Sequence, residues 1–346
     1  MPHLLRAALL ALLTLHGAAA MAADSKPLYL AHLNKNDATD NGTAAMAVAF
    51  KAALGSASET GIRVEIFPEG QLGNDPNVVE LVRKGVIQSA ISSVGGLSTL
   101  YPLIGVLDYP FAFRGIEDAY RVLDGPFGDR LRVDIQSRTD MAVLGFGDTG
   151  GLFVITNSKH PVRTPAEMAG LRIRAMGLPS HQSFLRSLGA EPVSVAWSEL
   201  YSALQSGVAD GQMNPPSIVR FGQLDEVQRY LTVTNHFYTP YVWVANASYL
   251  AGLDAAQRQA VEQAARAGIE ASRKLARDKD AAGAGLNALA RRLKVHELSE
   301  SEIAAFRAKA QPTMAAFIAE KLGPDGVSLL DAFRAAIAEA EKPRVR

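Results

Sequence analysis

Two arginines lie two positions apart in residues 171–174, a short segment that predicts a β-strand. Arg172 and Arg174 would project from one face of that strand, because alternate side chains of a strand share a face. A guanidinium can donate two parallel hydrogen bonds to a carboxylate, so an arginine here could bind an organic anion. The spacing alone favours solvated surface arginines, so the anion-binding interpretation needs a second line of support.

Most other chemistries lack the residues that they require. The chain has no cysteine, which excludes disulfides, iron–sulfur clusters, cysteine zinc sites and cysteine nucleophiles. Its seven histidines form no H-E-x-x-H motif, and no G-x-S-x-G motif occurs. Lysine plus arginine (35) equals aspartate plus glutamate (35), so no basic excess favours nucleic acid. The sequence predicts no enzyme, no cofactor and no metal site.

Two motifs resemble ligand sites but have simpler interpretations. Residues 145–150 match G-x-G-x-x-G, but residues 152–156 predict a strand where a dinucleotide site needs a helix. We expect these glycines at a crossover between domains. The acidic loop 36–41 lacks EF-hand spacing, so Asp40 or Asn41 more simply caps the next helix.

The chain alternates strands and helices in two successive sets. Its 346 residues, 48% of them apolar, suffice for two domains. Predicted strands are residues 28–33, 62–67, 86–92, 141–146, 152–156, 171–174 and 208–212, and predicted helices include 78–84, 180–188 and 198–206. This order predicts an α/β fold with largely parallel sheets and a cleft between two lobes.

A proline-free segment follows from Asp254 to about Ala290 with apolar residues at helical spacing. At 1.5 Å per residue its roughly 37 residues would span about 55 Å, more than one lobe requires. Gly283 and Gly285 weaken its end. We expect one long helix that crosses both lobes.

The N-terminal segment has the features of a signal peptide. Arg6 precedes an apolar run over residues 7–15, and small residues at 18–22 offer A-x-A cleavage sites. A membrane anchor needs about 20 apolar residues, and this run is interrupted at Thr14. The sequence therefore predicts a signal peptide over residues 1–22 and a periplasmic protein.

An ordered set of motifs resembles the DctP-type solute-binding proteins of tripartite ATP-independent periplasmic (TRAP) transporters. The motifs are residues 67–73 (FPEGQLG), 84–85 (KG), 109–111 (YPF), 156–159 (TNSK), 164–174 (TPAEMAGLRIR), 188–190 (LGA), 197–212 (WSELYSALQSGVADGQ), 214–215 (NP) and 234–236 (TNH). Each is weak alone, but together they cover nearly the whole chain after the signal peptide.

The resemblance implies a two-lobed clamshell whose lobes are discontinuous in sequence. Lobe I would comprise residues 24–150, 238–279 and 312–342, and lobe II residues 151–237 and 280–311. The implied function is a non-catalytic receptor that delivers an organic acid to the small and large membrane subunits of the transporter. A sensor or adaptor of a signalling receptor is an alternative, and an exported enzyme is a weaker one.

The resemblance also assigns site residues. Arg174 matches the arginine that binds the ligand carboxylate, Asn214 a ligand-binding amide and Trp197 a pocket aromatic, while Ser92 and Ser93 fall in a loop facing the ligand. Further candidate ligand-binding residues are Asn34, Phe153, Tyr241 and Trp243, although core packing is an equal alternative for Trp243.

One departure from the family pattern bears on the ligand. Many members have a second arginine two or three positions before the TNSK segment, where this chain has Val154 and Phe153. A site with one arginine and aromatic walls favours a monocarboxylate with an aromatic or branched body over a diacid. A sugar acid stacked on tryptophan remains an alternative.

Overall fold

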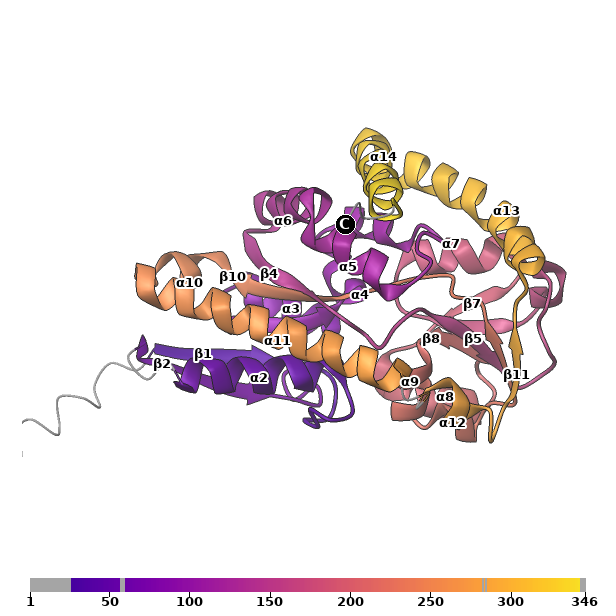
Figure 1. Cartoon of the computed structure of the whole chain (residues 1–346), viewed down its shortest axis with the longest axis horizontal. Helices are drawn as coiled ribbons and strands as arrows, with labels where there is room; N and C mark the ends of the chain where they lie inside the picture. Colours follow the sequence, from indigo (N-terminus) through magenta and orange to yellow (C-terminus); the bar gives the residue numbers. More distant parts are fainter. Residues whose placement is uncertain (1–25, 57–59, 282, 284, 343–346) are drawn as a thin grey trace, which may run out of the picture.

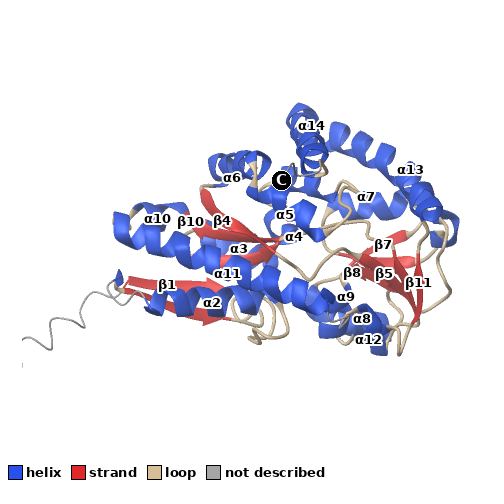
Figure 2. Cartoon of the chain, viewed as in Figure 1, coloured by secondary structure: helices blue, strands red, loops and turns tan. Residues whose placement is uncertain are grey.

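The computed structural model describes residues 26–56, 60–281, 283 and 285–342. Their strands form two separate sheets with helices packed on both faces of each (Figures 1 and 2). This is the predicted two-lobed α/β architecture, and we name the first and second lobes after their sheets. The signal peptide predicted for residues 1–22 lies outside the described residues.

The first sheet has the strand order β2-β1-β3-β10-β4. Its strands are β1 (Lys26–Ala31), β2 (Ile62–Phe67), β3 (Ser89–Ser93), β4 (Met141–Gly147) and β10 (Tyr241–Asn246). On β10, Val242 and Val244 enter one apolar core while Trp243 enters the core on the opposite face. Both faces of this strand are therefore buried.

Helices α2 and α11 cover one face of this sheet, and most of the other helices of the lobe cover the opposite face (Figure 1). They are α2 (Gly42–Ser56), α3 (Asp75–Arg83), α4 (Val94–Leu97), the 3₁₀ helix η2 (Pro102–Asp108), α5 (Ile116–Asp124), α6 (Pro126–Thr139), α10 (Ala247–Ala251) and α11 (Ala255–Ala281). The Asn41 Oδ1 accepts a hydrogen bond from the Ala44 amide (2.9 Å) at the start of α2. The helix-cap interpretation of the acidic loop is confirmed at Asn41.

The second sheet has the order β11-β9-β5-β8-β6-β7. Its strands are β5 (Val154–Asn157), β6 (Arg172–Ala175), β7 (Glu191–Ser194), β8 (Gly211–Asn214), β9 (Tyr230–Val233) and β11 (Lys294–Glu297). Its helices are η3 (Pro165–Met168), α7 (Pro179–Ser187), η4 (Trp197–Glu199), α8 (Leu200–Gln205), α9 (Pro216–Phe221), η5 (Leu224–Glu226), α12 (Leu286–Leu289) and α13 (Glu300–Phe317).

Both sheets are largely parallel, as predicted, and each contains one antiparallel strand. In the first sheet β10 runs antiparallel to β3 and β4, and in the second β5 runs antiparallel to β8 and β9. The reason is that the chain leaves the first lobe after β4 and returns through β10. Crossover strands that run between two sheets cannot all keep the direction set by βα units.

The two crossover segments run side by side. The Thr149 Oγ1 donates to the Thr239 carbonyl (2.8 Å), and the Phe153 amide donates to the Phe237 carbonyl (2.8 Å). The glycine motif lies here, on β4 and the segment after it, and β5 follows it. A Cβ on Gly145 would approach the Ile269 Cδ1 to 2.2 Å. The glycines thus lie at the crossover, as predicted, and Gly145 permits close packing of β4 against α11.

Helix α11 crosses from the first lobe toward α9 and α12 of the second (Figure 1). It begins as expected, because the Asp254 Oδ1 accepts from the Gln257 amide (2.8 Å). It ends at Ala281 rather than near Ala290, so its 27 residues span about 40 Å. Gly283 adopts a positive φ of 58°, a conformation that interrupts the helix.

The C-terminal helices form a second connection. Helix α13 packs on α7 of the second lobe, and a π-helical turn η6 (Ile318–Leu322) leads into α14 (Gly323–Ala340), which packs on α5 of the first lobe. None of the helices in the described part of the chain is long and apolar enough to span a bilayer.

Candidate functional site

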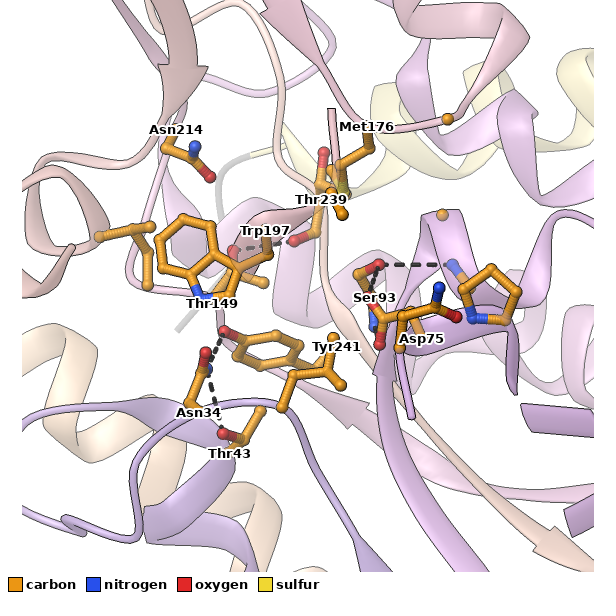
Figure 3. A pocket seen from close by; sticks show the side chains of 18 of the residues that line it. Asn34, Thr43, Asp75, Ser93, Thr149, Met176, Trp197, Asn214, Thr239 and Tyr241 are labelled. Atoms are coloured by element: carbon orange, nitrogen blue, oxygen red, sulfur yellow. Dashed lines mark hydrogen bonds between the residues drawn. The ribbon is translucent and has the colours of Figure 1, made fainter. Parts of the chain in front are cut away.

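A cavity of about 300 Å³ lies between the two lobes (Figure 3). The first lobe lines it with the loop after β1 and with α2, α3 and β3, and the second lobe with β6, the loop before η4 and the end of β8. Apolar side chains such as Leu33, Ile91, Phe153 and Ile218 form much of its wall. A molecule held here would contact both lobes.

Of the residues that the structure describes, Arg174 is the only lysine or arginine that lines the cavity. It lies on β6 and is 3% exposed, and its Nε donates to the Val195 carbonyl (2.9 Å). Within the described residues its guanidinium has no carboxylate at ion-pair distance and no other hydrogen bond. Burial lowers its pKa to about 10, opposed by the negative charge of Asp75. A buried cation without a bonded counter-charge is suited to receive an anion.

Arg172 occupies a different environment, although it lies on the same strand. Its Nη2 and Nε contact the two carboxylate oxygens of Asp210 at 2.7 and 3.1 Å, and its side chain is 41% exposed. It does not line the cavity. The interpretation of a surface arginine therefore holds for Arg172 and fails for Arg174.

Two further residues of the second lobe complete this side. Asn214 ends β8, and its Nδ2 donates to the Gln212 Oε1 (2.6 Å), which fixes the amide at the cavity. The Trp197 ring is stacked on Phe221 with an interplanar angle of 5°, so α9 holds it as a wall of the cavity.

The first lobe presents a rigid polar group opposite Asn214 (Figure 3). The Asn34 Nδ2 donates to both the Thr43 Oγ1 (3.1 Å) and the Tyr241 hydroxyl (3.0 Å). Burial raises the pKa of Tyr241, so its hydroxyl stays protonated. Because these side chains hold each other, they need little ordering when a ligand arrives.

Asp75 and Ser93 lie together on the same lobe (Figure 3). The Asp75 Oδ2 accepts from the Ser93 hydroxyl (2.6 Å), and its Oδ1 accepts from the Ser92 hydroxyl (2.9 Å). Burial raises the pKa of Asp75, opposed by the hydrogen bonds from Ser93 and Ser92 and by Arg174. The site therefore contains one cation and one acid, supplied by opposite lobes.

Comparison with known proteins identifies the family. The family model described as bacterial extracellular solute-binding protein, family 7 (DctP) matches residues 31–321. The chain belongs to the DctP family. Its members are solute-binding proteins of TRAP transport systems and not enzymes, as the sequence predicts.

Relatives within the DctP family carry different names. The chain is 33% identical over 214 residues to the 2,3-diketo-L-gulonate-binding periplasmic protein YiaO of Escherichia coli, covering 62% of this chain and 65% of that protein. The chain thus spans just under two thirds of that relative. It is 30% identical to the C4-dicarboxylate-binding periplasmic protein DctP of Rhodobacter capsulatus, covering 80% and 82% of the two chains.

A solved structure of the family is also similar. It is a TRAP periplasmic solute-binding protein from Bordetella whose bound density was interpreted as pantoate. The two chains are 30% identical with a TM-score of 0.80, over 90% of this chain and 99% of that one. The likeness therefore extends to both lobes.

The structure brings most of the predicted DctP-type site residues to one cavity. These are Arg174, Asn214, Trp197, Phe153, Ser93, Asn34 and Tyr241. Their binding role remains a prediction.

Trp243 and Ser92 require correction, because neither lines the cavity. Trp243 is fully buried beneath α11, where its Nε1 donates to the Ser89 Oγ (2.8 Å) and its ring packs edge-on against Phe50. It lies two residues farther along β10 than Tyr241, which carries it into the core. Ser92 is buried behind the wall and supports Asp75.

Sequence reasoning missed Asp75, Thr43, Thr149, Met176 and Thr239 as lining residues. Asp75 is the first residue of α3, where an acid ordinarily interacts with the helix dipole. The threonines carry no pattern that distinguishes them from surface threonines. The only signal for Asp75 was its position two residues after the motif at 67–73.

Proposed function

We propose that this protein is the periplasmic receptor of a TRAP transporter that binds an organic monocarboxylate through Arg174 and delivers it to the membrane subunits. The observation that carries the proposal is the buried, unpaired guanidinium of Arg174 in a cavity between two lobes. The predicted signal peptide supports export to the periplasm. We retain the lobe boundaries given above as part of this proposal.

The proposed binding step follows from the placement of the polar groups. The guanidinium would bind the carboxylate through its free Nη donors, since its Nε is held by the Val195 carbonyl. Asn214 would donate or accept beside it on the same lobe. The first lobe would contact the rest of the ligand only when the cleft is closed, so binding favours the closed state.

The charge of the cavity supports a monocarboxylate over a dicarboxylate. Arg174 can neutralise one carboxylate, and Asp75 would repel a second one that lies toward the first lobe. Phe153 lines the cavity at one of the two positions where many family members have a second arginine, and the apolar lining suits a branched or aromatic body. The pantoate named for the Bordetella structure is a branched monocarboxylate, which agrees with this class.

A sugar acid is the second candidate, because the hydroxyls of Thr43, Thr149 and Thr239 line the same cavity. The 2,3-diketo-L-gulonate named for the Escherichia coli relative belongs to this class. Both candidates share the carboxylate and differ in the rest of the molecule. Binding measurements on the two classes decide between them.

The test of the proposal is Arg174→Ala in protein freed of ligand by unfolding and refolding. We expect calorimetry with a panel of monocarboxylates, sugar acids and C4-dicarboxylates to show a loss of about 2 to 5 kcal/mol of binding free energy for every acid that binds. Arg174→Lys should also bind weakly, because an ammonium cannot form the two parallel hydrogen bonds.

Arg172→Ala is the matched control. It removes an arginine from the same strand but outside the cavity, and Lys159 (3.3 Å) still pairs with Asp210. Its affinity should equal that of the wild type. Affinity within a few-fold of wild type in folded Arg174→Ala protein would overturn the proposal. If C4-dicarboxylates bind more tightly than every monocarboxylate of the panel, only the assignment of the ligand as a monocarboxylate is overturned.

A further inference from the structure

We propose that Gly222 is a specificity-determining residue that sets how large a ligand body the cavity accepts. Gly222 itself does not line the cavity. It lies against Trp197, which does, and its lack of a side chain leaves room for the edge of the Trp197 ring. The inference rests on the proposed function, because it requires that this cavity holds the ligand.

The ring of Trp197 lies between α9 and the cavity. It is stacked on Phe221 with 6.3 Å between the two ring centres, and Gly222 follows Phe221 directly at the end of α9. A Cβ on Gly222 would lie 3.0 Å from the ring carbon Cη2 of Trp197. An ordinary contact between two carbon atoms is about 3.5 to 4.0 Å long. A side chain at position 222 therefore requires a neighbour to move.

Trp197 is the neighbour that has room to move. The same Cβ would approach the Leu224 Cγ (3.2 Å) and the Ile218 carbonyl oxygen (3.3 Å). Leu224 is fully buried in an apolar core, and the Ile218 carbonyl accepts a hydrogen bond from the Gly222 amide (2.9 Å). Trp197 is only half-buried and borders the cavity. Its ring would therefore shift away from α9 and into the cavity, by about half an ångström.

The backbone of Gly222 does not itself require glycine. Its φ of −80° and ψ of 3° suit most residues, so alanine would change the contacts of this position and not its conformation. Gly252 is a matched control, because it ends α10 with a φ of −78° and a ψ of −2°. Among the described residues, a Cβ on Gly252 would meet nothing closer than 3.5 Å. The two glycines thus differ in the contact with Trp197 and not in backbone conformation.

A displaced Trp197 ring would narrow the cavity from the side of the second lobe. In the view of Figure 3 this ring lies between Asn214 of the second lobe and Tyr241 of the first. The cavity holds about 300 Å³, so a ligand that fills it contacts this wall closely. Adding volume to a filled site causes strain, whereas a small ligand leaves the space that the ring would occupy. Large ligand bodies should therefore lose affinity, and small ones should keep it.

The first measurement compares acids that share a carboxylate and differ in the size of the body. The pairs are butanoate with 3,3-dimethylbutanoate, acetate with phenylacetate, and glycerate with gluconate, which cover the branched, aromatic and sugar-acid classes. In Gly222→Ala we expect the larger member of a pair that binds to the wild type to lose about fivefold or more in affinity, and the smaller member to stay within about twofold. Calorimetry on the full mature chain freed of ligand gives both values, and Gly252→Ala should leave them unchanged.

The second measurement follows the ring without any ligand. The chain has two tryptophans, Trp197 and Trp243, so 5-fluorotryptophan gives two fluorine NMR signals, and Trp197→Phe assigns them. Gly222→Ala should shift the Trp197 signal and leave the signal of Trp243, which lies in a core of the first lobe. Gly252→Ala should leave the Trp197 signal in place. In a Trp197→Phe background, Gly222→Ala should no longer change the affinity ratio, because the contacting ring carbon is absent.

Three results would overturn the inference. One is an equal loss of affinity for both members of a pair in Gly222→Ala, because that is the effect of a purely structural residue. Another is a Trp197 signal that does not shift, or that Gly252→Ala shifts equally, and the third is a size effect that persists in the Trp197→Phe background. These results leave the proposed function intact. Affinity that survives in Arg174→Ala contradicts the proposed function instead, and the fluorine signals still test the displacement of Trp197.

Discussion

Two buried arginines of this protein have opposite surroundings. Arg273 on α11 is 7% exposed, and its Nη1 and Nη2 bind the Asp124 carboxylate at 2.5 and 2.9 Å. It also donates to the Phe146 carbonyl and lies 4.5 Å from the centre of the Tyr120 ring. Arg174 is 3% exposed and has only the Val195 carbonyl.

The pKa values of the two arginines shift in opposite directions. Burial lowers both, but at Arg273 the Asp124 carboxylate outweighs burial and raises the pKa. At Arg174 burial dominates and lowers it to about 10. Among the described residues, the arginine that holds the crossing helix to the first lobe is paired with a carboxylate, although its Nε has no hydrogen-bond partner, whereas the arginine of the cavity has no carboxylate partner. Incomplete pairing of a buried charge, more than burial itself, thus distinguishes the binding site.

The buried His32 tests how burial without a counter-charge affects the free energy of unfolding. It gives the largest effect that we expect. Burial lowers the pKa of His32 to about 4, against about 6.5 in an unfolded chain. The unfolded state therefore binds more protons between pH 6.5 and 4, and stability is lost as the pH falls through this range. The loss for His32 approaches about 3 kcal/mol near pH 4.

The measurement is the free energy of unfolding in urea between pH 7 and pH 4, for wild type and His32→Gln. The variant should lose less stability than the wild type over this range. The control is His160→Gln, the same substitution at an exposed histidine. Equal slopes for wild type and His32→Gln would show that His32 charges freely in the folded protein.

Arg273→Met tests the paired side of the comparison. It leaves Asp124 without its partner and removes a hydrogen bond to the Phe146 carbonyl. Because Asp124 is 49% exposed, water screens its charge, and we expect a loss of about 2 kcal/mol rather than the 3 to 5 kcal/mol of a fully buried pair. Denaturant unfolding gives this value.

The same variant should keep its ligand affinity, because Arg273 does not line the cavity. Calorimetry on folded Arg273→Met protein checks this. A large loss of affinity without loss of stability would mean that the helix pairing controls the cavity, and the contrast between the two arginines would fail.

Sequence patterns predicted which face a side chain occupies better than how far along its strand it lies. The strand over residues 62–67 was placed correctly, and alternation put Arg172 and Arg174 on one face of β6. The alternation of side chains between the two faces of a strand is a local property of the backbone. Whether a given strand position lines the cavity depends on where the second lobe lies along that strand. No local sequence pattern specifies this. Arg172 and Trp243 each lie two residues from a cavity residue and outside the cavity.

The resemblance to a family supplied Arg174, but the place of Asp75 in the cavity required the fold. In the sequence Asp75 is an ordinary acid of a first helical turn, next to an asparagine cap. Only the packing of α3 against β3 brings it to Ser93 and into the space shared with Arg174. The end of α11 was predicted too far along the chain for a similar reason. Apolar residues recur at helical spacing past Gly283, whereas the helix ends at Ala281.

The smallest expected effect concerns the ligand-free stability of the unpaired arginine. Arg174→Met replaces a buried charge with an apolar side chain of similar length. The lowered pKa of Arg174 reflects a cost of about 3 kcal/mol for its charge at neutral pH. Loss of the hydrogen bond to the Val195 carbonyl offsets about 1 kcal/mol or more of the gain.

We therefore expect Arg174→Met to raise the unfolding free energy of the ligand-free protein by about 1 kcal/mol, or the melting temperature by about 2 °C. Calorimetric melting after removal of ligand measures it, and the same variant should show no stabilisation by any acid of the panel. Arg273→Met, which changes the same residue types at similar burial, should shift the melting temperature downward. A lower melting temperature for ligand-free Arg174→Met would mean that the guanidinium is already compensated in the empty cavity, and the difference between the two arginines would then lie in geometry alone.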